Sequence, residues 1–182
     1  MYYEKTSKQK TVYAGNVISV ECQEVELVNG KRANREIVRH NGGAAVLALT
    51  KDHKIVVVRQ YRKPFDEMIE EVPAGKLDEG EEPIECAKRE LAEETGYLAE
   101  EITFVGKCYP TPGYSDEVIY LYFADQLIAG KTNADEDEFL QVEEKTIADF
   151  LEDVDSGKIV DGKTLALVGK CRRILEKRRE GK

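Results

Sequence analysis

Histidine and cysteine are scarce in this sequence, and neither forms a pattern that holds a metal ion. The two histidines, His40 and His53, stand in separate parts of the chain, so a histidine metal site is not expected. The cysteines lack the paired spacing of zinc sites; they are Cys22, Cys86, Cys108 and Cys171. We therefore expect reduced thiols and a cytoplasmic protein.

Long apolar runs and an excess of basic residues are also missing. No stretch approaches the length of a membrane span, and the first ten residues, MYYEKTSKQK, lack the apolar core of a signal peptide. The chain has 27 Lys and Arg against 36 Asp and Glu, a net charge of −9. This balance disfavours binding to nucleic acid or to a membrane surface, both of which attract basic proteins. An anionic substrate would need local arginines and a metal ion.

The 182 residues, 41% of them hydrophobic, suffice for one compact domain with modest additions. We find no internal repeat and no low-complexity linker. Extended patterns come first, a helix lies in the middle, further strands follow, and helices come last. This order predicts an α+β fold with a mixed sheet.

An N-terminal β-hairpin is predicted ahead of the core. Residues 11–27 alternate apolar and polar side chains, Asn29 and Gly30 favour a turn, and residues 35–39 resume the extended pattern. A hairpin alone is rarely stable in water. The hairpin could cover the exposed edge of the chain's own sheet or exchange with a second copy. We expect an extension of residues 1–40 that packs against a second copy in a homodimer, and a core domain of residues 41–182.

The core is expected to contain a central helix. Pro83 suits a first helical turn and Gly96 a helix end, so the helix should span the residues between them. Its apolar stripe should face the core, and consists of Ile84, Ala87, Leu91 and Thr95. Other predicted strands and helices cover residues 44–49, 55–58, 69–73, 102–109, 118–124, 139–142, 146–154 and 163–178.

Three acids stand close together on another face of this helix. Glu90, Glu93 and Glu94 are three and four positions apart, within about one turn. Clustered carboxylates suit a hard cation such as Mg²⁺, and Arg89 is placed to pair with Glu93. The alternative is a solvated acidic helix face, which is common in Glu-rich proteins.

The stretch from Gly75 to Tyr97 resembles the Nudix box. In that pattern a glycine is followed by five residues and a glutamate, then seven residues and an Arg-Glu pair, an apolar residue, and after one more position Glu-Glu. One further residue precedes a glycine and a final apolar residue. The positions that match are Gly75, Glu81, Arg89, Glu90, Leu91, Glu93, Glu94 and Gly96, and Tyr97 replaces the usual aliphatic residue.

The resemblance implies a Nudix α/β/α sandwich and a hydrolase of nucleoside diphosphates linked to a further group. It also implies Mg²⁺, with Mn²⁺ as a substitute. The Ala74 carbonyl, Glu90 and Glu94 would be ligands, and Glu93 would ligate or support them. Ahead of the box, Ala74 and Gly75 are expected to form a tight turn.

Further segments look like bacterial ADP-ribose pyrophosphatases; they are residues 35–40, 60–62, 71–75, 112–117 and 161–164. The likeness implies cleavage of ADP-ribose to AMP and ribose 5-phosphate. Arg35 and Arg62 would meet the substrate, and each could instead be a charge on a strand edge. Glu71 would contact the adenosine or be an edge charge. Pro112 matches a proline that marks this subgroup; the alternative is an ordinary proline in a turn.

The general base is expected in the acidic run of residues 135–138, which matches a catalytic loop of the family. Glu138 is the first candidate because it abuts the predicted strand at Phe139, and Glu136 is the second. Glu93 in the box is the third. The alternative is a solvated loop.

Other activities stay open. The substrate could be an ADP-sugar or a dinucleotide such as NADH, or the chain could be a Nudix domain that senses nucleotides without hydrolysis. The intact box disfavours the sensing role. The acidic charge disfavours a role in messenger-RNA decapping.

Overall fold

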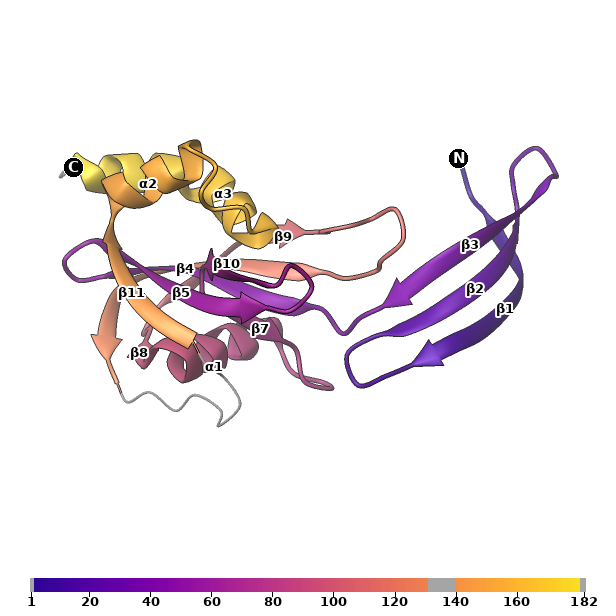
Figure 1. Ribbon diagram of the computed structural model, residues 1–182, viewed down its shortest axis with the longest axis horizontal. Helices are drawn as coiled ribbons and strands as arrows, with labels where there is room; N and C mark the ends of the chain where they lie inside the picture. Colours follow the sequence, from indigo (N-terminus) through magenta and orange to yellow (C-terminus); the bar gives the residue numbers. More distant parts are fainter. Residues whose placement is uncertain (1, 131–139, 181–182) are drawn as a thin grey trace. The chain divides into compact units, whose positions relative to one another are not determined.

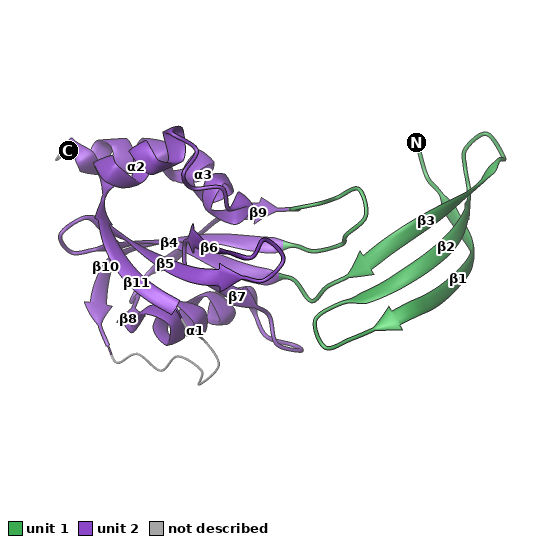
Figure 2. Cartoon of the chain, in the orientation of Figure 1, with its two compact units in different colours: residues 1–42, 109–118 green, residues 43–108, 119–182 purple. Residues whose placement is uncertain are grey.

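The structure is a computed structural model that describes residues 2–130 and 140–180. They form two compact units, coloured separately in Figure 2. The first holds residues up to 42 together with 109–118, and the second holds 43–108 and the chain from 119 onward. The division at residue 40 remains a prediction. The candidate bases Glu136 and Glu138 lie outside the described residues.

The first unit contains a three-stranded antiparallel sheet in the order β1-β2-β3. Its strands are β1 (Lys5–Ala14), β2 (Ser19–Glu26) and β3 (Arg32–Arg39). The expected hairpin corresponds to β2 and β3 with the turn at Gly30, whose φ is 77°. The expectation of one extended segment over residues 11–27 was wrong: residues 11–14 end β1, the chain turns where the Gly15 amide donates to the Ile18 carbonyl at 2.9 Å, and β2 begins at Ser19. The first half of β1 was not predicted because it is polar and without alternation. All ten residues of β1 are exposed.

Residues 109–118 belong to the first unit although they connect two strands of the second. The Val38 amide donates to the Tyr114 carbonyl at 2.7 Å, and the Asp116 amide donates to the Val38 carbonyl at 3.1 Å. Arg39 pairs with Asp116 at 2.9 Å. These bonds fix the loop along β3.

The second unit is built on a mixed eight-stranded sheet. Its central strands β4 and β10 are parallel, and the other pairs are antiparallel. The strands are β4 (Gly43–Thr50), β5 (Lys54–Arg62), β6 (Glu67–Glu71), β7 (Ala74–Lys76), β8 (Tyr97–Leu98), β9 (Ile102–Cys108), β10 (Ile119–Ala129) and β11 (Leu140–Thr146).

Helices cover both faces of this sheet, as Figure 1 shows. Helix α1 (Pro83–Thr95) packs on one face, and α2 (Ile147–Asp155) and α3 (Gly162–Arg179) on the other. Successive side chains of β4 point to opposite faces of the sheet and so enter two hydrophobic cores. Val46 packs with α1, whereas Leu47 packs with α2 and α3. Burying one such leucine contributes about 1.5–3 kcal/mol. The predicted α/β/α sandwich with an N-terminal antiparallel extension is confirmed.

The predicted ends of α1 are correct. Pro83 lies in the first turn, and Gly96 ends the helix with a φ of 71°. Ala87, Leu91 and Thr95 are buried as expected, but Ile84, which lies in the first turn, is 37% exposed. In the described part of the chain, no helix is both long and apolar enough to cross a membrane.

Candidate active site

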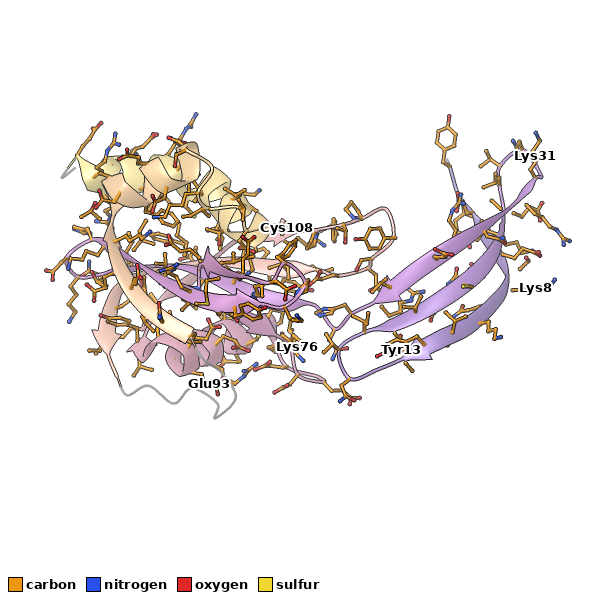
Figure 3. The ribbon with its side chains drawn as sticks, viewed as in Figure 1. Lys8, Tyr13, Lys31, Lys76, Glu93 and Cys108 are labelled. Carbon is orange, nitrogen blue, oxygen red and sulfur yellow. The ribbon has the colours of Figure 1, made fainter. Side chains whose placement is uncertain are left out.

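The acids of α1 divide between the protein interior and solvent. Glu90 and Glu94 are buried, with exposures of 9% and 3%, whereas the Glu93 side chain is 35% exposed. Figure 3 labels Lys76 of β7 and Glu93 of α1, one residue from each of the two elements described here. One helical turn therefore presents two carboxylates to the backbone of β7 and a third to water.

Arg89 joins the carboxylates of the box. Its Nη1 donates to Glu90 at 2.8 Å and to Glu93 at 3.0 Å, so the predicted pair with Glu93 is confirmed. Its Nε and Nη2 donate to the two oxygens of Glu81 at 2.9 and 3.0 Å. The Arg89 hydrogen bond lowers the pKa of Glu81 to about 2, and Glu81 in turn raises the pKa of Arg89. Sequence reasoning placed Glu81 in the box without a role, and the structure makes it the anchor of Arg89.

Ala74 and Gly75 do not form the expected turn. They lie in β7, where Ala74 is opposite Ala45 of β4 and Gly75 is opposite Ala44. A Cβ on Gly75 would lie 1.9 Å from the carboxylate carbon of Glu90. Gly75 is therefore required by the close approach of a helix side chain to the strand, rather than by backbone flexibility.

The Ala74 amide donates to a carboxylate oxygen of Glu94 at 3.0 Å. This bond orients Glu94 against β7 and holds the Ala74 peptide at the same place. The backbone carbonyl of Ala74 and the carboxylates of Glu90 and Glu94 thus belong to one small region between β7 and α1.

This region suits a hard divalent cation. The single Arg89 guanidinium pairs with three carboxylates, those of Glu81, Glu90 and Glu93. Glu94 lies on the same helix, one turn from Glu90. Carboxylate and carbonyl oxygens are the donors that Mg²⁺ and similar ions prefer. Within residues 2–130 and 140–180, no three Asp, Glu, His or Cys side chains already converge on one point. Binding would therefore turn the carboxylates from their present hydrogen-bond partners.

Substitution of Gly75 by Ala tests this arrangement. The new methyl group would displace the Glu90 carboxylate, so we expect the affinity for Mn²⁺, measured by electron paramagnetic resonance, to fall about 10- to 100-fold. The matched control is Gly169→Ala, because a Cβ at Gly169 meets nothing within 4 Å. Equal Mn²⁺ affinity in the two variants would show that the approach of Glu90 to β7 has no part in metal binding.

A second cluster of charges lies beside the first. Glu71 at the end of β6 is only 1% exposed. Arg62 of β5 donates to both its oxygens, from Nε at 2.6 Å and from Nη2 at 2.7 Å, and Lys163 of α3 also contacts it. Burial opposes the charge of Glu71, but the two cations together hold its pKa below the usual value. The pKa of Arg62 is raised chiefly by Glu71, with smaller contributions from the charges of Asp161 and Glu94.

The structure distributes the predicted residues over both units. Ala74, Glu90, Glu93 and Glu94 meet at β7 and α1, and Arg62 with Glu71 lies in the same unit. Arg35 and Pro112 belong to the other unit. Arg35 pairs with Glu4 at 2.5 Å, and Pro112 is exposed in the loop that follows β9. Sequence reasoning did not select Lys163, although it lies in the segment 161–164 that carried part of the resemblance.

The chain is similar to several known proteins. The profile of the NUDIX domain matches residues 39–166. An ADP-ribose pyrophosphatase of Bacillus subtilis (strain 168) is 46% identical over 163 residues, 88% of each chain. A methanol dehydrogenase activator of Bacillus methanolicus is 44% identical over 171 residues, 92% of each. A crystal structure of an ADP compounds hydrolase superimposes with a TM-score of 0.82 at 25% identity, covering 97% of this chain and 96% of that one.

Proposed function

This chain belongs to the Nudix hydrolase family, and from that premise we propose that it hydrolyses the diphosphate bond of ADP-ribose to AMP and ribose 5-phosphate. The observation that carries the proposal is the placement of Glu90 and Glu94 against β7, where Gly75 admits the Glu90 carboxylate. The similarity to the Bacillus subtilis ADP-ribose pyrophosphatase supports the choice of substrate. The absence of a basic excess supports a small-molecule substrate over nucleic acid. We also propose that the enzyme is cytoplasmic.

Members of this family use a divalent metal, and we propose Mg²⁺, with Mn²⁺ as a substitute. Glu90, Glu94 and the Ala74 carbonyl would hold it, and Glu93 would support them from the exposed side of α1. When bound, the cation neutralises the diphosphate oxygens and makes the phosphorus more open to attack. Arg89 keeps the Glu90 and Glu93 side chains in place through the bonds described above.

The chain's own residues would also bind and orient the substrate. Arg62 is 38% exposed and uses Nε and Nη2 for Glu71, which leaves Nη1 directed away from that pair. A guanidinium is well suited to phosphate oxygens. We assign Arg62, Arg35 and Pro112 to substrate binding. Glu71 takes part by holding Arg62.

Hydrolysis needs a group that removes a proton from water. We propose Glu138 as this base, with Glu136 and then Glu93 as the other candidates. The oxygen of the water attacks one phosphorus, the bond from that phosphorus to the bridging oxygen breaks, and the base takes the proton of the water. AMP and ribose 5-phosphate leave as the two products.

A substrate panel tests the proposed function. The purified chain would be incubated with Mg²⁺ and ADP-ribose, an ADP-sugar, a GDP-sugar, NADH or a nucleoside triphosphate, and the products identified by mass. We expect ADP-ribose to have the highest kcat/KM and all activity to disappear with EDTA. Faster turnover of another member of the panel would change the substrate assignment and leave the family unaffected.

The Bacillus methanolicus relative favours a second candidate, the activation of a dehydrogenase. The test is to add the chain to a methanol dehydrogenase and to measure the rate of methanol oxidation. A rise in that rate that persists in the Glu94→Gln variant would favour an activating role without hydrolysis. No rise would remove this candidate.

We further propose a homodimer in which the N-terminal unit lies against a second copy and brings Arg35 towards an active site. The unit has a small sheet whose strand β1 is exposed throughout, with Val12 and Tyr13 more than half exposed. Small isolated sheets gain stability by packing on another surface. Light scattering should give twice the 20.6 kDa of one chain at micromolar concentration. A fully active monomer would remove this proposal.

A further inference from the structure

The first turn of α3 contacts the segment that leads into β7. Asp161 caps the helix by accepting the amide of Thr164 at 2.9 Å, and it also accepts the Thr164 hydroxyl at 2.7 Å. The Thr164 oxygen in turn accepts the amide of Val72 at 3.0 Å, and Thr164 is fully buried. A hydrogen bond to α3 at Val72 therefore holds the backbone between Glu71 and Ala74 in place.

Lys163 occupies the same turn and faces the buried carboxylate. Its ammonium group contacts Glu71 and lies 2.9 Å from Asp161, and its side chain is only 14% exposed. Arg62 contacts the same Glu71 carboxylate with two of its nitrogens. Among the described residues, the third nitrogen, Nη1, has no hydrogen-bond partner. Two cations and two carboxylates thus alternate in the order Arg62, Glu71, Lys163 and Asp161.

The charge balance of this row depends on Lys163. With Lys163 the four groups are neutral together. Without it they carry one excess negative charge next to Glu94, whose charge already acts on Arg62. Arg62 would then be the only cation on a buried carboxylate, and a dianionic diphosphate would approach a more negative site.

We propose that Lys163 is a positioning residue for the diphosphate of the substrate. By sharing the Glu71 carboxylate, it leaves the outer edge of Arg62 available to phosphate oxygens, while Thr164 fixes the backbone that continues to Ala74. Lys163 acts through Glu71 and Arg62. The inference rests on the proposed function and adds to it a residue from the last helix of the fold.

A second lysine of the chain provides a matched control. Lys145 of β11 is 13% exposed and contacts two carboxylates, Glu70 at 2.5 Å and Asp153 at 2.5 Å. It therefore resembles Lys163 in burial, in charge and in having one partner on β6. Glu70 and Glu71 are neighbours on β6 whose side chains point to opposite sides of the strand. Loss of Lys145 should affect stability without affecting the substrate site.

The test compares Lys163→Met with Lys145→Met and with Lys163→Arg. For each variant we would measure KM, kcat, the thermal midpoint and, by calorimetry in EDTA, the Kd for intact ADP-ribose without turnover. We expect Lys163→Met to raise both KM and Kd about tenfold, the usual effect of one lost charged interaction, and to change kcat less than about threefold. Lys163→Arg should restore both to within about threefold of the wild type. Lys145→Met should lower the thermal midpoint and leave KM and Kd unchanged.

The inference would be overturned if Lys163→Met had the same KM as Lys145→Met and the same Kd as Lys145→Met. It would also be overturned if Lys163→Met lowered kcat and left KM and Kd unchanged. If Lys163→Met cannot be purified, Lys163→Gln replaces it with the same expected rise, since its amide keeps a hydrogen bond but no charge. If the wild type prefers another member of the panel, the measurements use that compound, so that an error in the assigned substrate is separated from an error about Lys163. If the wild type neither binds nor hydrolyses any member, the proposed function fails and this inference fails with it.

Discussion

Glu94→Gln and Glu90→Gln are each expected to lower kcat at ordinary Mg²⁺ concentrations by about a thousandfold. The amide keeps the shape of the side chain but is a weaker ligand for a hard cation. Loss of several kcal/mol of charge stabilisation corresponds to this factor, because about 1.4 kcal/mol is equivalent to tenfold in rate. In Glu94→Gln the side-chain amide oxygen can still accept the Ala74 amide that Glu94 accepts at 3.0 Å, so the fold should persist.

The thermal midpoint of both variants in EDTA should equal or exceed that of the wild type, because mutual repulsion among the acids decreases. Glu85→Gln on the same helix is the control. Its side chain is 61% exposed and pairs with Lys88, and its kinetics should match the wild type. A variant at position 90 or 94 with near-normal rates would show that the residue is not a metal ligand.

Glu138→Gln is expected to lower kcat by about 10²–10⁴-fold, the usual range for the loss of a general base. KM and the Mg²⁺ dependence should change little, because the base acts on water in the transition state and does not bind the ground-state substrate. Steady-state kinetics over a range of Mg²⁺ concentrations would test both parts. This pattern differs from that of Glu94→Gln, for which raising the Mg²⁺ concentration should recover part of the activity.

The same measurements on Glu136→Gln and Glu93→Gln decide among the candidates. A loss of less than about tenfold for Glu138→Gln would transfer the role to whichever of these two variants shows the larger fall in kcat. Glu93 accepts a hydrogen bond from Arg89 at 3.0 Å and so helps to hold the box together, and its variant should also change the Mg²⁺ dependence. Glu136→Gln is not expected to change the Mg²⁺ dependence.

Much of the site was determined by the sequence alone, because it depends on spacing within one helix. Pro83 and Gly96 set the ends of α1, and the three- and four-residue intervals set the position of Glu90, Glu93 and Glu94 relative to one another. The pair between Arg89 and Glu93 follows from the same periodicity. Local geometry of this kind is fixed by the helix, whatever packs around it.

The tertiary structure decided which side chains meet when they are far apart in the sequence. Gly75 was expected to allow a tight turn. A glycine is needed there because the Glu90 side chain of α1 occupies the space that a Cβ would fill. Glu71 was expected to contact the adenosine or to be a charge on a strand edge, and its carboxylate is enclosed by Arg62 and by Lys163, which is 92 positions away. No local pattern encodes these contacts. They arise because packing α1 and α3 on opposite faces of one sheet buries charged groups, and a buried carboxylate is stable only where the fold brings a cation to it.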